Sequence, residues 1–188
     1  MAYGSKKVVI PPTPVVEKSW MHYRRSGKYH GPQAAGGGAT AVITANRLYA
    51  YPFSVPVTTT FDRIAIQVTT AAAGSARLGI YADNGAIYPG ALILDAGTVN
   101  TGTTGTKEIE ISQSLSPGLY WLVFVTNAGP TFGGIDISHS YAPLGHANPY
   151  VAGDNLWAKD YTFNSLPASF PDGAFEWRVA LTIMLRKL

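Results

Sequence analysis

The chain has 188 residues, enough for one well-buried domain with an appendage, and its 46% hydrophobic and 13% charged residues, with 20 glycines and 13 prolines, favour short strands over helices. The absence of cysteine excludes a disulfide framework, a thiolate metal site and a cysteine nucleophile. The net charge of +3 is uneven, because residues 1–35 carry six basic side chains against one acidic, a net +5, whereas the rest of the chain carries eight against ten, a net −2.

Two further expectations come from the absence of long apolar segments. No apolar run is long enough to span a bilayer, so we expect no membrane partner. The first residues lack the apolar core of a signal peptide, so we expect synthesis in the cytoplasm.

Residues 1–40 have the composition of an extended basic arm. Prolines interrupt the apolar stretch 8–16, which excludes a helix or a central strand, and glycines 36–38 form a hinge. Disordered tails are poor in aromatic and aliphatic residues, whereas this arm contains both, so we expect it to become ordered on a partner. The residues expected to contact that partner are Val9, Ile10, Val15, Trp20, Tyr23, Arg24, Arg25 and Tyr29.

Two alternatives for the arm stay open. One is a disordered basic tail. The other is binding to single-stranded nucleic acid, which we consider unlikely because the six basic residues come without a recognition motif.

From residue 41 onward the hydrophobic pattern has a period of two. It predicts a strand over 41–51 with Ile43 and Leu48 pointing inward, and further strands over 61–70, 76–82, 91–95, 106–112 and 131–138. The stretch 119–125 is apolar at every position and follows a Pro-Gly turn, so it predicts a central strand buried on both faces.

The last segment shows the clearest alternation. It predicts one long strand over 175–185. The side chains expected on its buried face are Phe175, Trp177, Val179, Leu181, Ile183 and Leu185.

These strands and the lack of an amphipathic helix predict an all-β protein, an antiparallel β-sandwich. A jelly roll is the favoured version, because the long last strand would have to return to pair early in the sheet order. The expected domains are the arm, residues 1–40, and the sandwich, residues 41–188.

A specific order of turns and strands runs through the second part of the chain. The stretches are Phe61–Thr70, Ala76–Gly85, Tyr88-Pro89-Gly90, Leu94–Gly97, Leu115–Trp121 and Leu166–Gly173. Over about residues 40–188, this order resembles a jelly-roll-like domain of tailed-bacteriophage virion proteins of the tail-fibre, minor structural or decoration type. The resemblance implies a location in the virion more firmly than a task, and it does not cover the arm.

The sequence contains no recognisable catalytic or metal-binding motif. The histidines His22, His30, His139 and His146 fall in no metalloprotease pattern, no serine lies in a nucleophile elbow, and no pair of carboxylates stands out for glycoside cleavage. Residues 83–85 and 154–155 offer oxygen ligands for calcium, but such sequences more often form turns. We expect no enzyme, no catalytic residue, no metal and no cofactor.

The connection over residues 139–174 is unusually long for a compact domain and rich in aromatic residues. Its aromatics could close the end of the sandwich, form a subunit interface, or stack against a glycan. The candidate residues for an interface or ligand site are Tyr141, His146, Tyr150, Trp157, Tyr161 and Phe163.

The functional expectation is a non-enzymatic bacteriophage structural protein. Its arm would bind other virion proteins of the capsid or tail, and its sandwich would be displayed as a decoration, head-fibre or tail-fibre subunit, most readily as a homotrimer. The alternative is a receptor- or glycan-binding module that attaches to the host through the aromatic loop 139–174.

Overall fold

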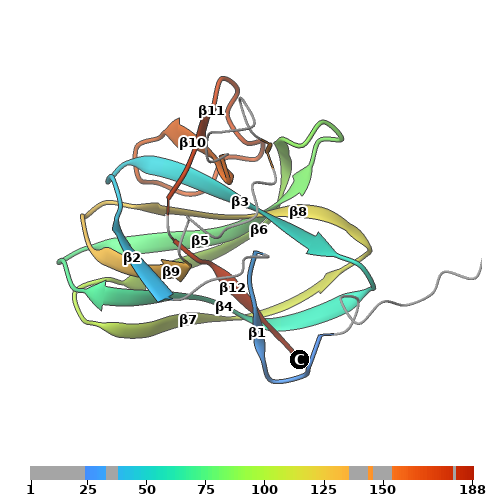
Figure 1. Ribbon diagram of the computed structural model, residues 1–188, viewed down its shortest axis with the longest axis horizontal. Helices are drawn as coiled ribbons and strands as arrows, with labels where there is room; N and C mark the ends of the chain where they lie inside the picture. Colours follow the sequence, from blue (N-terminus) through green and yellow to red (C-terminus); the bar gives the residue numbers. More distant parts are fainter. Residues whose placement is uncertain (1–23, 33–37, 136–143, 146–153, 180) are drawn as a thin grey trace, which may run out of the picture.

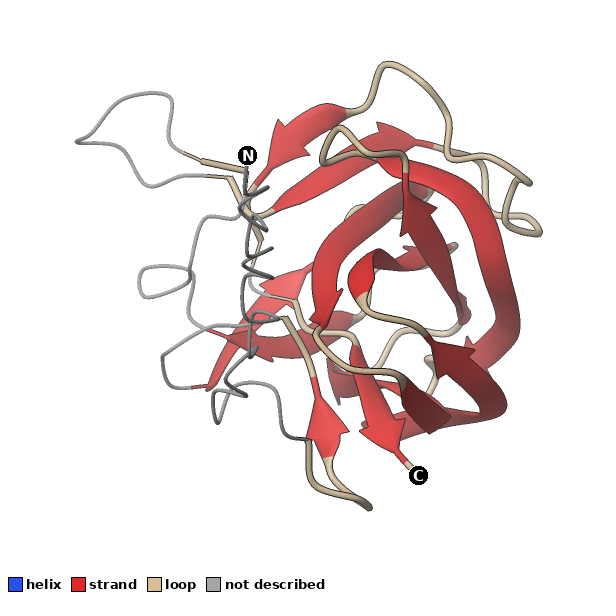
Figure 2. Cartoon of the chain, turned by 90° about the vertical axis from the view of Figure 1, so that its right-hand side faces the viewer, coloured by secondary structure: helices blue, strands red, loops and turns tan. Residues whose placement is uncertain are grey.

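The structure is a computed structural model that describes residues 24–32, 38–135, 144–145, 154–179 and 181–188. These residues form strands and loops without a helix (Figure 2). Two six-stranded sheets pack together, and all strand pairs within them are antiparallel (Figure 1). The predicted all-β sandwich is confirmed.

The sheets are named here by their strands. Sheet A contains β1 (Tyr29–His30), β2 (Gly38–Val42), β4 (Thr59–Thr70), β7 (Gly105–Leu115), β9 (Thr131–Ile135) and β12 (Met184–Lys187). Sheet B contains β3 (Arg47–Val55), β5 (Ser75–Asp83), β6 (Pro89–Asn100), β8 (Gly118–Thr126), β10 (Leu156–Asp160) and β11 (Phe175–Trp177). Most connections cross between the two sheets.

The long strand β4 organises sheet A. Strand β7 pairs along one side of it, from Thr59 to Val68. On the other side β12 pairs as far as Ala65 and β9 pairs from Val68 onward, and these two strands continue outward to β1 and β2. Between β12 and β9, therefore, sheet A is split beside residues 66–67.

Strand β8 lies inside sheet B, in the order β11-β10-β3-β8-β5-β6, and is buried on both faces as its sequence predicted. Leu122 and Phe124 point into the space between the sheets, where Phe124 stacks on Tyr49 with ring centroids 5.1 Å apart. Trp121 and Val123 point to the other face and are equally buried there. Something other than sheet A must therefore cover the outer face of sheet B.

That cover is the segment 161–174, which we call the cap. It runs beside the start of β6, where Leu92 N donates to Ala168 O at 2.9 Å and Phe170 N donates to Gly90 O at 2.9 Å. The cap places Leu166 and Phe170 over Tyr81 and Trp121 of sheet B. In Figure 1 this orange part of the chain lies at the top of the molecule.

The predicted strand over 41–51 is wrong, because the chain turns in its middle. Asn46 has a φ of 57° and its N–H donates to Thr126 O at 2.7 Å, so β2 ends in sheet A and β3 begins in sheet B. Ile43 is buried between the sheets as expected, whereas Leu48 is buried under the cap.

The predicted strand over 175–185 is also two strands, β11 in sheet B and β12 in sheet A. The expected inward face is confirmed for Leu181, Ile183 and Leu185, which are buried between the sheets. It is wrong for Phe175 and Trp177, which are exposed on β11. The alternation of apolar residues in the sequence thus continues across a change of sheet.

Two segments outside the predicted strands join the sheets. Strand β10 lies within the long connection 139–174 and pairs with β3. Strands β1 and β2 lie wholly or mainly within residues 1–40, so the described part of the predicted arm belongs to sheet A.

Candidate functional site

Three aromatic residues predicted for an interface or ligand site pack against the sandwich: Trp157 on β10, and Tyr161 and Phe163 in the cap. The ring of Trp157 packs on Tyr88 at a centroid distance of 5.0 Å, and its Nε1 donates to Ile87 O at 2.8 Å. Tyr161 and Phe163 pack on the same buried cluster. These contacts fit the first of the three sequence-based interpretations, closing the end of the sandwich. Tyr141, His146 and Tyr150 lie outside the described residues.

The described residues of the predicted arm also bind the sandwich itself. Arg24 Nη2 donates to Ser54 O at 2.5 Å, its guanidinium lies 4.6 Å from the ring centre of Phe53, and burial lowers the pKa of Arg24. The hydroxyl of Tyr29 donates to Glu108 on β7.

Of the other predicted arm contacts, only Arg25 lies within the described residues. Arg25 is exposed, and its carbonyl accepts from Lys28 N at 3.3 Å. The expected contacts that lie outside the described residues are Val9, Ile10, Val15, Trp20 and Tyr23.

An exposed pair of aromatic rings stands on β11, the outermost strand of sheet B. Phe175 is 37% and Trp177 43% exposed, and they are the two most exposed Phe, Tyr or Trp side chains in the described chain. The rings meet edge to face with centroids 5.7 Å apart. An exposed aromatic pair held in fixed geometry is unusual on a surface and marks a candidate binding site.

The guanidinium group of Arg47 contacts both rings of this pair. Its guanidinium lies 5.1 Å from the ring centre of Phe175 and 5.8 Å from that of Trp177, within range of a cation–π interaction. Its Nε donates to Asp160 Oδ1 at 2.7 Å, across the register pair that joins β3 and β10. We call Arg47, Asp160, Phe175 and Trp177 the aromatic platform.

The register explains why these four side chains share a face. Phe175 pairs with Ala158 and Trp177 pairs with Leu156, and both partners point toward the space between the sheets. Trp157 lies between these two and points to the opposite face, toward the cap. The platform thus lies on the other face of β10 from Trp157.

A pocket of about 310 Å³ lies at the split in sheet A. Its lining includes Tyr29, Ala65, Gln67, Gly133, Thr182 and Met184. The Gln67 side-chain oxygen accepts a hydrogen bond from the Thr106 hydroxyl at 2.7 Å.

The turn at residues 83–85, considered for calcium, uses its oxygens internally. Asp83 Oδ2 accepts from Gly85 N at 2.8 Å, and Asn84 Oδ1 accepts from Ala86 N at 2.8 Å. Within the described ranges, no group of three or more histidine, aspartate or glutamate side chains could hold a metal ion. The same ranges contain no helix that is long and apolar enough to cross a membrane.

The sequence did not reveal the aromatic platform. Phe175 and Trp177 have the same alternation phase as the buried Leu181 and Ile183, so periodicity placed them in the core. Arg47 is separated from them by more than 120 residues, and no local motif links the three.

Comparison with known proteins gives no family or relative for this chain. No protein-family model matches the sequence, and neither a curated protein nor a solved structure matches it.

Proposed function

We propose that this chain is a non-enzymatic structural protein of a bacteriophage particle, attached to the capsid or tail through its N-terminal residues and displaying the sandwich outward. The resemblance of residues 40–188 to virion domains supports this role. The main observation in its favour is that the N-terminal contact at Ser54 and the aromatic platform at Arg47 lie at opposite ends of one strand, β3. At roughly 3.3 Å per residue, residues 47 and 54 are about 23 Å apart.

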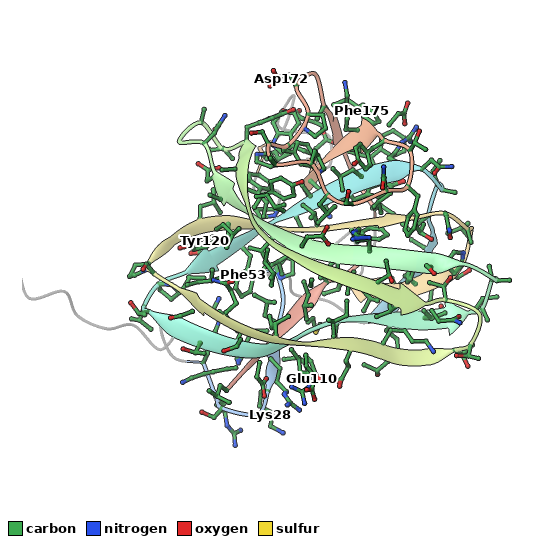
Figure 3. All side chains as sticks on the ribbon, turned by 180° about the vertical axis from the view of Figure 1, so that it is seen from behind. Lys28, Phe53, Glu110, Tyr120, Asp172 and Phe175 are labelled. Atoms are coloured by element: carbon green, nitrogen blue, oxygen red, sulfur yellow. The ribbon has the colours of Figure 1, made fainter. Side chains whose placement is uncertain are left out.

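The N-terminal end of the described chain lies at one end of that strand, where Arg24 binds Ser54. The aromatic platform lies at the other end, on Arg47. Figure 3 shows the same separation, with Lys28 and Phe175 at opposite ends of the molecule. A protein held by residues N-terminal to Arg24 would thus present the platform away from its attachment.

Residues 24–28, at the start of the described chain, are hydrogen-bonded to β12 of sheet A. Gly27 N donates to Lys187 O at 2.8 Å, Lys187 N donates to Lys28 O at 3.1 Å, and Lys187 Nζ donates to Arg24 O at 2.9 Å. A load applied through the N-terminal residues would pass directly into β12 and β4, which suits an anchor. Several copies, most readily three, would multiply weak attachments.

The test is incorporation into phage particles of a variant lacking residues 1–23, which leaves the described contacts of Arg24 intact. We expect the full-length chain to copurify with particles and the truncated chain to be absent from them while its melting temperature is preserved. Trp177→Ala, a change at the far end, should incorporate normally. Full incorporation of the truncated chain, or absence of the full-length chain from particles, would refute the proposal.

A further inference from the structure

We infer that the aromatic platform is a binding site for a neutral pyranose sugar, such as an uncharged hexose or N-acetylhexosamine residue of a surface polysaccharide. The inference rests on the proposed function only for the biological use of the site, as the displayed end of the protein. Its chemical basis is the combination of exposed rings and polar groups on one face of β10, β11 and the first residue of β3.

The rings supply the apolar half of such a site. A pyranose ring has an apolar face of C–H groups and an equatorial edge of hydroxyls, so it stacks on a flat aromatic side chain that water can reach. The exposed face of Trp177 meets this need, and its perpendicular contact with Phe175 fixes its orientation. Little entropy would therefore be lost in ordering the site.

The polar half consists of a donor and an acceptor side by side. Arg47 uses Nε for Asp160, and its two terminal nitrogens make no hydrogen bond to any described residue. The Asp160 side chain is 74% exposed, so its second oxygen can accept from a ligand. A guanidinium N–H beside a carboxylate oxygen matches two neighbouring hydroxyls, of which one accepts and one donates.

The charges favour an uncharged sugar over an acidic one. Arg47 is already paired with Asp160, whose carboxylate is exposed within the platform. A carboxylated sugar would have to compete with Asp160 for Arg47 and would be repelled by the Asp160 carboxylate.

The size and charge of the platform argue against a protein partner. Fully buried aromatic side chains contribute about 150–250 Å² each, so two rings that are 37% and 43% exposed offer only about 150–200 Å². A stable protein interface needs about 800 Å² per partner. Pairing of β11 with β11 of a second copy, in the register that aligns all three residues of both strands about a twofold axis, would also place the two Glu176 side chains opposite each other, which is unfavourable.

The test uses ligand-observed saturation-transfer difference NMR on the purified full-length protein with lactose, cellobiose, N,N′-diacetylchitobiose and glucuronic acid as probes. We expect millimolar binding of at least one neutral disaccharide, weakened at least about tenfold by Trp177→Ala, a loss typical of a truncated aromatic anchor. Trp177→Phe, which keeps a ring, should weaken binding less than the alanine variant. Trp157→Phe, on the opposite face of β10, should bind like the wild type.

Three outcomes would overturn the inference: no binding of any neutral probe, binding of glucuronic acid alone, or neutral binding that survives Trp177→Ala. Trp177 is exposed, so its substitution should leave the melting temperature nearly unchanged. The assay needs no phage particle. Sugar binding by a chain that is absent from particles would reject the virion role and keep the site, whereas an incorporated chain without sugar binding would reject the site alone.

Discussion

The indole N–H of Trp121 donates a hydrogen bond to Asp83 Oδ1 at 2.9 Å, beneath the cap. Trp121 is fully buried on β8, and Asp83 ends the neighbouring strand β5. The same carboxylate accepts from Gly85 N, so one side chain closes a turn and satisfies the largest buried donor of the core. The two functions of Asp83 couple the turn to the central strand.

The first prediction concerns this pair. Asp83→Ala should lower the free energy of unfolding by about 1–3 kcal/mol, because it leaves the buried indole N–H without a partner. Trp121→Phe removes the donor, so adding Asp83→Ala to it should cost less than adding it to the wild type. Urea unfolding of the two single variants and the double variant measures the coupling. Strictly additive effects would show that the hydrogen bond contributes nothing to stability.

The second prediction is a pH dependence at the join of β4 and β12. Arg186 donates to both oxygens of Asp62, at 2.9 and 2.7 Å, and these hydrogen bonds hold the pKa of Asp62 below its usual value. A depressed pKa stabilises the fold above the unfolded value of about 3.9 and loses this contribution as the pH falls through the folded pKa. Asp62→Asn should therefore flatten the acid limb of the melting-temperature profile.

Arg186→Met provides the matched control for the pH experiment. It removes the other partner and should flatten the same part of the profile, although it is also expected to lower the melting temperature at neutral pH. An unchanged acid limb in Asp62→Asn would mean that other carboxylates control the acid transition.

The third prediction concerns Gly79, at the centre of β5. A Cβ at this position would lie 2.2 Å from Leu166 Cδ1 in the cap and 2.5 Å from Leu94 O on β6. Gly79→Ala should destabilise the fold by about 1–3 kcal/mol, because the backbone of β6 has to move. Gly38→Ala, where nothing lies within 4 Å, is the control and should change stability by less than about 0.5 kcal/mol. Thermal unfolding that ranks the two variants equally would contradict the packing described for the cap.

The fourth prediction concerns Ile87, which has a φ of 57° and is 51% exposed. A β-branched residue in the left-handed region is strained by about 1–2 kcal/mol. Ile87→Gly should relieve this strain and stabilise the fold by about 0.5–1 kcal/mol after the larger entropy loss of glycine. Ile87→Ala should bring no comparable gain. Calorimetry on both variants distinguishes backbone strain from a simple loss of an exposed apolar side chain.

The sequence correctly predicted those strands whose burial follows from the pattern of apolar residues within the strand itself. An unbroken apolar run sufficed for β8, because both faces of that strand are covered. Alternation sufficed for β4, where Ile64, Ile66 and Val68 are buried between the sheets as expected. These patterns depend on neighbouring residues alone, so one sequence is enough to read them.

The errors occur where the alternation continues across a change of sheet. Ile43 and Leu48 are both apolar, and nothing in their spacing shows that the turn at Asn46 sends them to different layers. The sequence missed the aromatic platform for a related reason. The burial of Trp157 depends on Tyr88, and the exposure of Trp177 depends on its position on the outermost strand, so both are properties of distant pairing.

The hydrogen bonds of Lys187 bring the N-terminal side of the described chain and its last residues to one corner of the molecule. A fluorescent protein or gold tag fused after Leu188 would consequently lie close to Arg24. It could then obstruct binding of the partner that we propose for the residues before Arg24. Such a fusion would report the position of the tether and could itself impair docking. Reporters meant to mark the distal tip are better inserted at Gly85, in an exposed hairpin bend remote from that corner.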